Sequence, residues 1–243
     1  MIDIHTHILP GIDDGARDLG DTLAMAEIAV KNGVTDMIAT PHFNIPRGFE
    51  NYVGEEYWQV FHLAQEAIAQ EGIPLNLYPG MEVYTIEEVP QLLKAGKLMT
   101  LNKSRYLLME FAFGGDPDFA DQMLRRTAAE GIVPVIAHIE RDHFVQAIPG
   151  IAEEWKDRGY VIQCNKGSFQ GRFGREEERL AYHLMDRQLV DVIASDTHRP
   201  YRRTPNLWEV YDQLAMEYPE SWLDELFTEN PERILHDLPI EQR

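Results

Sequence analysis

The chain has 243 residues, of which 44% are hydrophobic and 26% charged, and its formal net charge at pH 7 is −19. This composition is typical of a globular protein, and the acidic balance argues against broad nucleic-acid binding, which needs a basic surface. No run approaches the roughly 20 apolar residues of a membrane-spanning helix, so membrane insertion is not expected. No linker or internal repeat divides the sequence, and we predict a single domain over residues 1–243.

The start of the chain and its cysteine content bear on location. No basic region followed by an apolar run precedes His5, where functional-looking residues begin, so no signal peptide is expected. The single cysteine, Cys164, excludes an internal disulfide framework and suits a reducing compartment. A cytoplasmic location is therefore predicted.

Seven short apolar runs recur along the chain and predict buried strands. They are Ile2–Ile4, Met37–Ala39, Leu75–Tyr78, Tyr106–Met109, Val133–Ala137, Tyr160–Ile162 and Val190–Ala194. Such runs fit strands that are covered on both faces of a parallel sheet. Because helical patterns alternate with them, we predict a parallel α/β barrel, with an open doubly wound sheet as the structural alternative.

The stretches between most of these runs have apolar residues three or four positions apart, as on the buried face of a helix. The predicted faces comprise Leu23, Ala26 and Val30; then Tyr57, Phe61, Ala64 and Ile68; then Leu180 and Leu184, continued by Arg187; and finally Leu207, Val210 and Leu214. Asp21 is predicted to cap the first of these helices, and Asp116 to cap the helix that follows it.

Residues suited to metal binding stand at the downstream ends of the predicted strands. They are His5, His7, His42, Glu82, Glu110, His138, Asp196 and His198, and Asp14 lies in the loop after the first strand. A lone histidine or carboxylate is usually structural, but six of the seven strands end in such residues. Because downstream strand ends meet at one mouth of a barrel, these side chains are expected to converge. Mixed imidazole and carboxylate ligands favour Mn, Fe, Co or Zn over Ca or Mg.

The opening MIDIHTHILPGIDDG is similar to the first motif of the PHP (polymerase and histidinol phosphatase) superfamily. More narrowly, the whole chain resembles the manganese-dependent bacterial protein tyrosine phosphatases of capsular and exopolysaccharide systems. The segments that carry this resemblance are IATPHF at 38–43, YPGMEVY at 78–84, LNKSRYLLMEF at 101–111, AHIERDHF at 137–144, QCNKGSFQGRFG at 163–174, ASDTHR at 194–199 and NPERIL at 230–235.

The resemblance implies a distorted TIM-like (β/α)7 barrel of the PHP fold and three divalent metal ions, with Mn²⁺ expected. The implied ligand sets are His5, His7, Glu82 and Asp196 for the first ion; Glu82, Glu110 and His138 for the second; and Asp14, His42 and His198 for the third. The implied reaction is hydrolysis of phosphotyrosine by a metal-bound hydroxide. The implied partner is the tyrosine-rich tail of a bacterial tyrosine kinase that regulates polysaccharide synthesis, and homo-oligomerisation is left open.

Three arginines near the predicted mouth are candidates for binding the phosphate. Arg141, three residues beyond His138, is expected to bind it bidentately, with Arg203 the second candidate and Arg47 the third. The sequence departs from the family pattern at Ile139, where proline is usual, and in the loop 44–47. These departures bear on peptide preference and remove no ligand.

Two other functions stay open at this point. One is a PHP-type phosphatase acting on a small phosphomonoester, such as histidinol phosphate or a sugar phosphate. The other is a non-catalytic, metal-stabilised module that binds phosphotyrosine. A cysteine-dependent phosphatase is excluded, because it needs an arginine six positions after its cysteine and that position holds Gln170.

Overall fold

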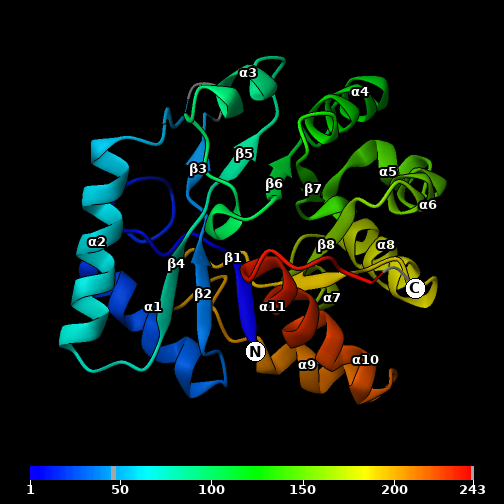
Figure 1. Ribbon diagram of the computed structural model, residues 1–243. Coiled ribbons are helices and arrows are strands. Elements are labelled where there is room, and N and C mark those ends of the chain that lie inside the picture. The colour runs from blue at the N-terminus through cyan, green and yellow to red at the C-terminus, as the bar shows by residue number, and fades with distance from the viewer. Residues whose placement is uncertain (45–47, 242–243) are drawn as a thin grey trace.

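A computed structural model of the protein describes residues 1–44 and 48–241 (Figure 1). One sheet has the strand order β1-β2-β4 and comprises β1 (Ile2–Thr6), β2 (Asp36–Ala39) and β4 (Asn76–Pro79). The other has the order β3-β5-β6-β7-β8-β9 and comprises β3 (His42–Phe43), β5 (Glu82–Tyr84), β6 (Tyr106–Glu110), β7 (Val133–Ile136), β8 (Val161–Asn165) and β9 (Val192–Ala194). All of these pairings are parallel.

The two sheets belong to one curled arrangement. Strands β3 and β5 continue the lines of β2 and β4 after two-residue interruptions at 40–41 and 80–81. The end of β1 is bridged to the segment after β9 through Thr6 and Thr197, and the His7 N–H donates to the Thr197 carbonyl oxygen at 2.9 Å. The strands thus occupy seven positions in a distorted barrel, and each predicted apolar run falls in one of them. The predicted (β/α)7 architecture is confirmed.

Helices surround these strands in Figure 1. They are α1 (Leu19–Lys31), α2 (Glu55–Gln70), α3 (Val89–Lys94), α4 (Pro117–Ala128), α5 (His143–Ala147), α6 (Gly150–Asp157), α7 (Lys166–Phe169), α8 (Arg175–Asp186), α9 (Trp208–Leu214), α10 (Glu220–Asp224) and α11 (Asn230–Leu235). Other helical turns are η1 (Leu101–Lys103), η2 (Ile139–Arg141) and η3 (Glu225–Glu229). Among the described helices, none combines the length and the apolar character that crossing a bilayer demands.

Apolar side chains fill the inside of the barrel. The cluster contains Ile4, Ile38, Leu108, Val135, Val161 and Val192 from six strands. Ile234 and Leu235 of α11 belong to the same cluster, and α11 lies beside β1 in Figure 1. The end of the barrel where the strands begin is therefore closed by α11, and polar side chains gather at the opposite end.

A second apolar cluster lies between the strands and the surrounding helices. The α2 face predicted from the sequence is buried in it, namely Tyr57, Phe61, Ala64 and Ile68. The cap of α4 is confirmed, because the Asp116 side chain accepts a hydrogen bond from the Asp118 N–H. The predicted cap of α1 is wrong: Asp18 is the N-cap residue, whereas Asp21 lies in the first turn and pairs with Arg17.

Candidate metal centre

His5, on β1, and His7, just after it, lie at the polar end of the barrel. The pairing of β1 with β2 shifts by one residue between Asp3 and Thr6, which marks a bulge in β1. Bulges redirect side chains, and here the Nδ1 atom of His5 lies 3.2 Å from Oε1 of Gln163 on β8. The Nε2 atoms of His5 and His7 are 3.4 Å apart. Both imidazoles are buried and face the same space.

Glu82 lies at the centre of the cluster, with histidines around both of its oxygens. Its Oε1 is 2.9 Å from Nε2 of His138 and 3.2 Å from Nε2 of His5. Its Oε2 is 2.9 Å from Nδ1 of His42 and 3.3 Å from Nε2 of His7. His42 is its direct register partner on β3. Residues from widely separated parts of the chain thus converge on one buried carboxylate.

Asp196 and His198 follow β9 and complete the rim. Oδ1 of Asp196 is 3.4 Å from Nε2 of His7, and Nε2 of His198 is 3.4 Å from Oδ1 of Asp14. The same Asp14 oxygen is 3.5 Å from Nε2 of His42. The Asp14 side chain is 54% exposed, whereas the residues around it are buried, namely His7, His42, Asp196 and His198. Asp14 therefore marks the outer edge of the centre.

The backbone is left-handed at two of these positions, with φ of 34° at His138 and 49° at Asp196. Such conformations cost non-glycine residues about 1–3 kcal/mol and occur preferentially at functional sites. Each of these residues comes two positions after the end of a barrel strand, β7 or β9. The backbone is therefore strained at two candidate ligands, whose side chains point into the cluster.

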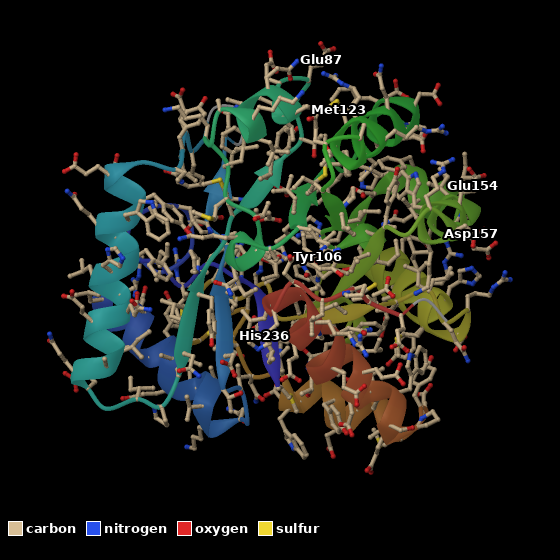
Figure 2. The ribbon with its side chains drawn as sticks, in the orientation of Figure 1. Glu87, Tyr106, Met123, Glu154, Asp157 and His236 are labelled. Atoms are coloured by element: carbon tan, nitrogen blue, oxygen red, sulfur yellow. The ribbon has the colours of Figure 1, made fainter. Side chains whose placement is uncertain are left out.

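The side chains form four overlapping groups whose potential ligand atoms lie within 4.8 Å of one another. The groups are His7, Asp14, His42 and His198; His5, His7 and Asp196; His5, Glu82 and His138; and His42, Glu82 and Glu110. All nine ligands predicted from the sequence therefore meet at one place. The remaining histidines, His62, His143, His183 and His236, join no such group among the described residues, and His236 lies beside α11 in Figure 2.

The grouping differs in detail from the implied ligand sets. His7 approaches the set expected for the third ion, and Glu82, Glu110 and His138 are divided between two groups. The convergence is a feature of the structure, while the division of ligands among ions stays a prediction.

Unpaired atoms support a cation at the inner part of the cluster. Nδ1 of His42, Oε2 of Glu82 and Oε2 of Glu110 are buried and have no hydrogen-bond partner. The first lies 2.9 Å from the second and 3.7 Å from the third, without the alignment of a hydrogen bond. An unsatisfied buried polar group costs about 1–3 kcal/mol. A cation shared by the three atoms would remove that cost, and this donor set suits Mn, Fe, Co or Zn.

Burial sets the protonation state of Glu110 and His138 in the absence of a cation. Desolvation raises the pKa of Glu110 to about 9, and the nearby Glu82 and Asp196 carboxylates add to the shift. Desolvation lowers the pKa of His138 to about 4, so its imidazole is neutral at pH 7. A neutral imidazole keeps a lone pair for a metal ion, but the Glu110 carboxyl must first lose its proton.

Metal affinity is therefore expected to rise with pH. Below about pH 9 a cation must displace the proton of Glu110, and this competition weakens as the pH increases. Calorimetric titration of the metal-free protein with Mn²⁺ between about pH 6.5 and 8.5 should show tighter binding at the higher pH. Buffers of different ionisation enthalpy should reveal proton release on binding. An affinity independent of pH, without proton release, would contradict this account.

Asp13, which the sequence reasoning did not select, holds two of the candidate ligands. Its Oδ2 is 2.7 Å from Nδ1 of His7 and accepts the His42 N–H at 3.0 Å, while Oδ1 accepts the Gly15 N–H at 2.8 Å. A Cβ atom at Gly15 would lie 2.1 Å from the His7 carbonyl oxygen, so this loop needs glycine to approach so closely. With Nδ1 held by Asp13, His7 presents Nε2 to the cluster.

Two amide side chains on β8 also support the centre. Oε1 of Gln163 accepts the His138 N–H at 2.9 Å, and its Nε2 donates to Oδ1 of Asn165 at 2.9 Å. Nδ2 of Asn165 donates in turn to Oδ2 of Asp196 at 2.6 Å. Gln163 and Asn165 lie on the same face of β8 as Val161, which faces the barrel interior. Polar residues at interior strand positions were the sequence signal that could have identified them.

Both described candidate arginines border the cluster. The guanidinium carbon of Arg141 lies 4.2 Å from the ring centroid of Phe113 and 4.5 Å from that of Phe173. Arg203 donates to Oδ2 of Asp196, and its second terminal nitrogen lies 3.2 Å from Nε2 of His198. A cavity of about 170 Å³ is lined by both arginines, Phe113 and most of the candidate ligands. This cavity can admit an anion between guanidinium groups and the ligand cluster.

The departure at Ile139 affects the surroundings of the cavity rather than its lining. Ile139 is fully buried in the apolar layer between strands and helices and does not line the cavity. Arg47, the third candidate for phosphate binding, lies outside the described residues, and so does most of the loop 44–47. The expectation for Arg47 stays a prediction.

Comparison with known proteins gives a family match over nearly the whole chain. The family model described as "Capsular polysaccharide synthesis, CpsB/CapC" matches residues 1–236. The tyrosine-protein phosphatase YwqE of Bacillus subtilis (strain 168) is 35% identical, with 99% of this chain and 93% of the relative covered. The tyrosine-protein phosphatase CpsB of Streptococcus pneumoniae is 32% identical, with 98% and 99% covered.

A solved structure also matches over the full length. It comes from a study of YwqE from Bacillus subtilis and CpsB from Streptococcus pneumoniae, described as unique metal-dependent tyrosine phosphatases. The TM-score is 0.92 at 34% sequence identity, and the alignment covers 100% of this chain and 97% of the other.

Proposed function

Because the chain belongs to the CpsB/CapC family of capsular polysaccharide synthesis, we propose that it is a metal-dependent phosphatase that hydrolyses phosphotyrosine in proteins. The observation that carries the proposal is the convergence of five histidines and four carboxylates at the mouth of the barrel, beside two arginines. The similarity to YwqE and CpsB supports the same chemistry.

The proposed cofactor is a set of three divalent ions, and the proposed metal is Mn²⁺. The proposed first set is His5, His7, Glu82 and Asp196; the second is Glu82, Glu110 and His138; and the third is Asp14, His42 and His198. When bound, such ions neutralise charge on the phosphoryl oxygens and make a water molecule acidic enough to attack phosphorus near neutral pH. Glu82 is proposed to serve two sets because both of its oxygens face histidines.

The arginines are proposed to bind the phosphate oxygens that do not react. Arg141 and Arg203 line the cavity, and a guanidinium can donate two parallel hydrogen bonds to a phosphate. Phe113 and Phe173 keep the Arg141 guanidinium in place through contacts with their ring faces. Phe113 also gives the cavity an apolar wall against which an aryl group can pack. A phenolate, whose conjugate acid has a pKa near 10, can leave without a strong general acid.

The proposed substrate is the phosphorylated tyrosine-rich tail of a bacterial tyrosine kinase in the same polysaccharide system. The family description supports a role in that system. The position of half-exposed Asp14 at the outer edge of the centre supports access by a side chain that projects from a polypeptide.

A substrate panel tests the proposal against its alternatives. With Mn²⁺ present, turnover of a phosphotyrosyl peptide should exceed turnover of histidinol phosphate and sugar phosphates. Faster hydrolysis of histidinol phosphate would assign the site to small phosphomonoesters. Binding of the phosphotyrosyl peptide without release of phosphate would show a non-catalytic binding module instead.

Asp13→Ala is expected to lower Mn²⁺ affinity by about 10- to 100-fold, because groups that orient metal ligands have effects of this size. The change frees the imidazole of His7 and removes the acceptor of the His42 N–H. Competition with a metal-binding dye measures the affinity. Asp18→Ala removes the α1 cap, in which the Asp18 side chain accepts the Asp21 N–H, and serves as the control for a general loss of stability. Equal metal affinity in both variants and the wild type would reject the role of Asp13.

A further inference from the structure

A second cavity adjoins the one that holds the candidate centre. It measures about 330 Å³ and is lined by Asp14, His198, Arg199, Tyr201, Arg202 and Arg203. Three of these residues, Asp14, His198 and Arg203, also line the cavity of the centre. The two spaces therefore lie side by side, and we refer to the second as the Arg202 pocket.

The charge of the Arg202 pocket contrasts with that of the protein. The chain has a formal net charge of −19, yet this pocket has three arginines and one carboxylate, Asp14. Asp14 is a candidate metal ligand, so a bound cation would offset its charge. The pocket is then a local site of positive charge on an acidic protein, next to the place where a phosphate would bind.

The three arginines differ in what they already contact. Arg199 donates to the backbone carbonyl oxygens of Asp14 at 2.7 Å and His198 at 2.8 Å, and Arg203 donates to Asp196. Arg202 is exposed and makes no hydrogen bond or ion pair with any residue of 1–44 or 48–241. The Arg202 guanidinium is thus available to a ligand. The hydrogen bonds of Arg199 and Arg203 hold the loop that carries Arg202.

Tyr201 gives the pocket an aromatic wall. It is 68% exposed, and the guanidinium carbon of Arg17 lies 5.9 Å from its ring centroid. A large exposed aromatic side chain next to the Arg202 guanidinium is suited to a peptide, because the ring packs against backbone and aliphatic groups while the guanidinium pairs with an anion.

We propose that the Arg202 pocket binds the carboxylate of an aspartate or glutamate next to the phosphotyrosine, so that the enzyme prefers acidic flanking sequences. This inference rests on the proposed function, since it requires a phosphotyrosyl peptide in the adjoining cavity. An extended peptide advances about 3.3 Å per residue. A side chain one or two residues from the phosphotyrosine therefore reaches a cavity that shares three lining residues with the first.

Matched peptides test the inference. The substrates are phosphotyrosyl peptides with glutamate within two positions of the phosphotyrosine, on one side or the other, their glutamine counterparts, and p-nitrophenyl phosphate, all with Mn²⁺. For the wild type, kcat/KM should be about three- to fivefold higher for the glutamate peptide than for its glutamine counterpart, on at least one side of the phosphotyrosine. The difference should arise mainly from a lower KM, and its size is that expected of an exposed ion pair. Arg202→Ala should remove this preference, and Arg202→Glu should reverse it. Turnover of p-nitrophenyl phosphate should stay unchanged.

Arg179→Ala is the matched control, because Arg179 is an exposed arginine on α8 outside the pocket. Equal kcat/KM for glutamate and glutamine peptides in the wild type, or a preference that survives in Arg202→Ala, would overturn the inference while the phosphatase activity stands. A parallel loss of p-nitrophenyl phosphate turnover in Arg202→Ala would also overturn it. No turnover of any substrate by the metal-loaded wild type would overturn the proposed function itself, and the inference with it.

Discussion

Glu82→Gln is expected to lower kcat/KM for a phosphotyrosyl peptide by at least about a hundredfold, with the fold retained. Even groups that only orient metal ligands change activity by about 10- to 100-fold when removed. Glu82 is placed to do more, because its two oxygens face four histidines at 2.9–3.3 Å. Glutamine keeps the volume of the side chain and removes the charge that attracts a cation.

The matched control for this variant is Glu87→Gln, an exposed carboxylate that points outward at the periphery of the molecule in Figure 2. It should show wild-type activity and metal content. Steady-state kinetics and metal content are measured on both variants, and circular dichroism checks the fold. A Glu82→Gln enzyme with near-normal turnover would remove Glu82 from the proposed site.

Arg141→Ala is expected to cost about 2–5 kcal/mol in transition-state binding, measured from the ratio of kcat/KM values. The Arg141 side chain is 20% exposed and its guanidinium contacts two phenylalanine rings, so water replaces it poorly as a partner for phosphate. Arg141→Lys should recover part of the loss, because lysine keeps the charge but lacks the planar, bidentate geometry.

Arg125→Ala is the control, since Arg125 is 60% exposed on α4 and pairs with Asp121 of the same helix. Its kinetics should match the wild type. A loss below about 0.5 kcal/mol in Arg141→Ala would place Arg141 with ordinary surface charges, whose removal has effects of that size.

The barrel and the cluster were predictable from the sequence because both follow from simple rules. Strands covered on both faces are continuous apolar runs, and the downstream ends of parallel strands share one rim. Glu82 and His138 could be selected because each follows such a run, although 56 positions separate them. The structure places them 2.9 Å apart.

The features that could not be predicted from the sequence depend on specific contacts that only the folded structure shows. Asp13 precedes Asp14 in the same loop, and only the fold shows that Asp13 holds His7 while Asp14 faces the cavity. The role of Gln163 depends on contacts with His5 on β1 and with the His138 N–H after β7. The cap of α1 was misplaced by three residues because Asp21 pairs with Arg17 rather than with the free N–H groups of its helix.

The buried face of α1 also differs from the face predicted by the spacing of its apolar residues. Its predicted apolar face included Leu23 and Val30, which are only partly buried, while Met25 and Ala29 are fully buried. Several residues of this helix are apolar, so its spacing permits more than one buried face. Packing against the barrel, rather than the pattern alone, selects among them.

The most direct test of the account combines elemental analysis with activity before and after chelation. Purified protein is expected to contain about three divalent ions per chain, as the proposed ligand sets require. Chelation should abolish hydrolysis of a phosphotyrosyl peptide, and added Mn²⁺ should restore it. Undiminished turnover by protein shown to be free of metal would contradict the claim that the converging histidines and carboxylates act by holding cations.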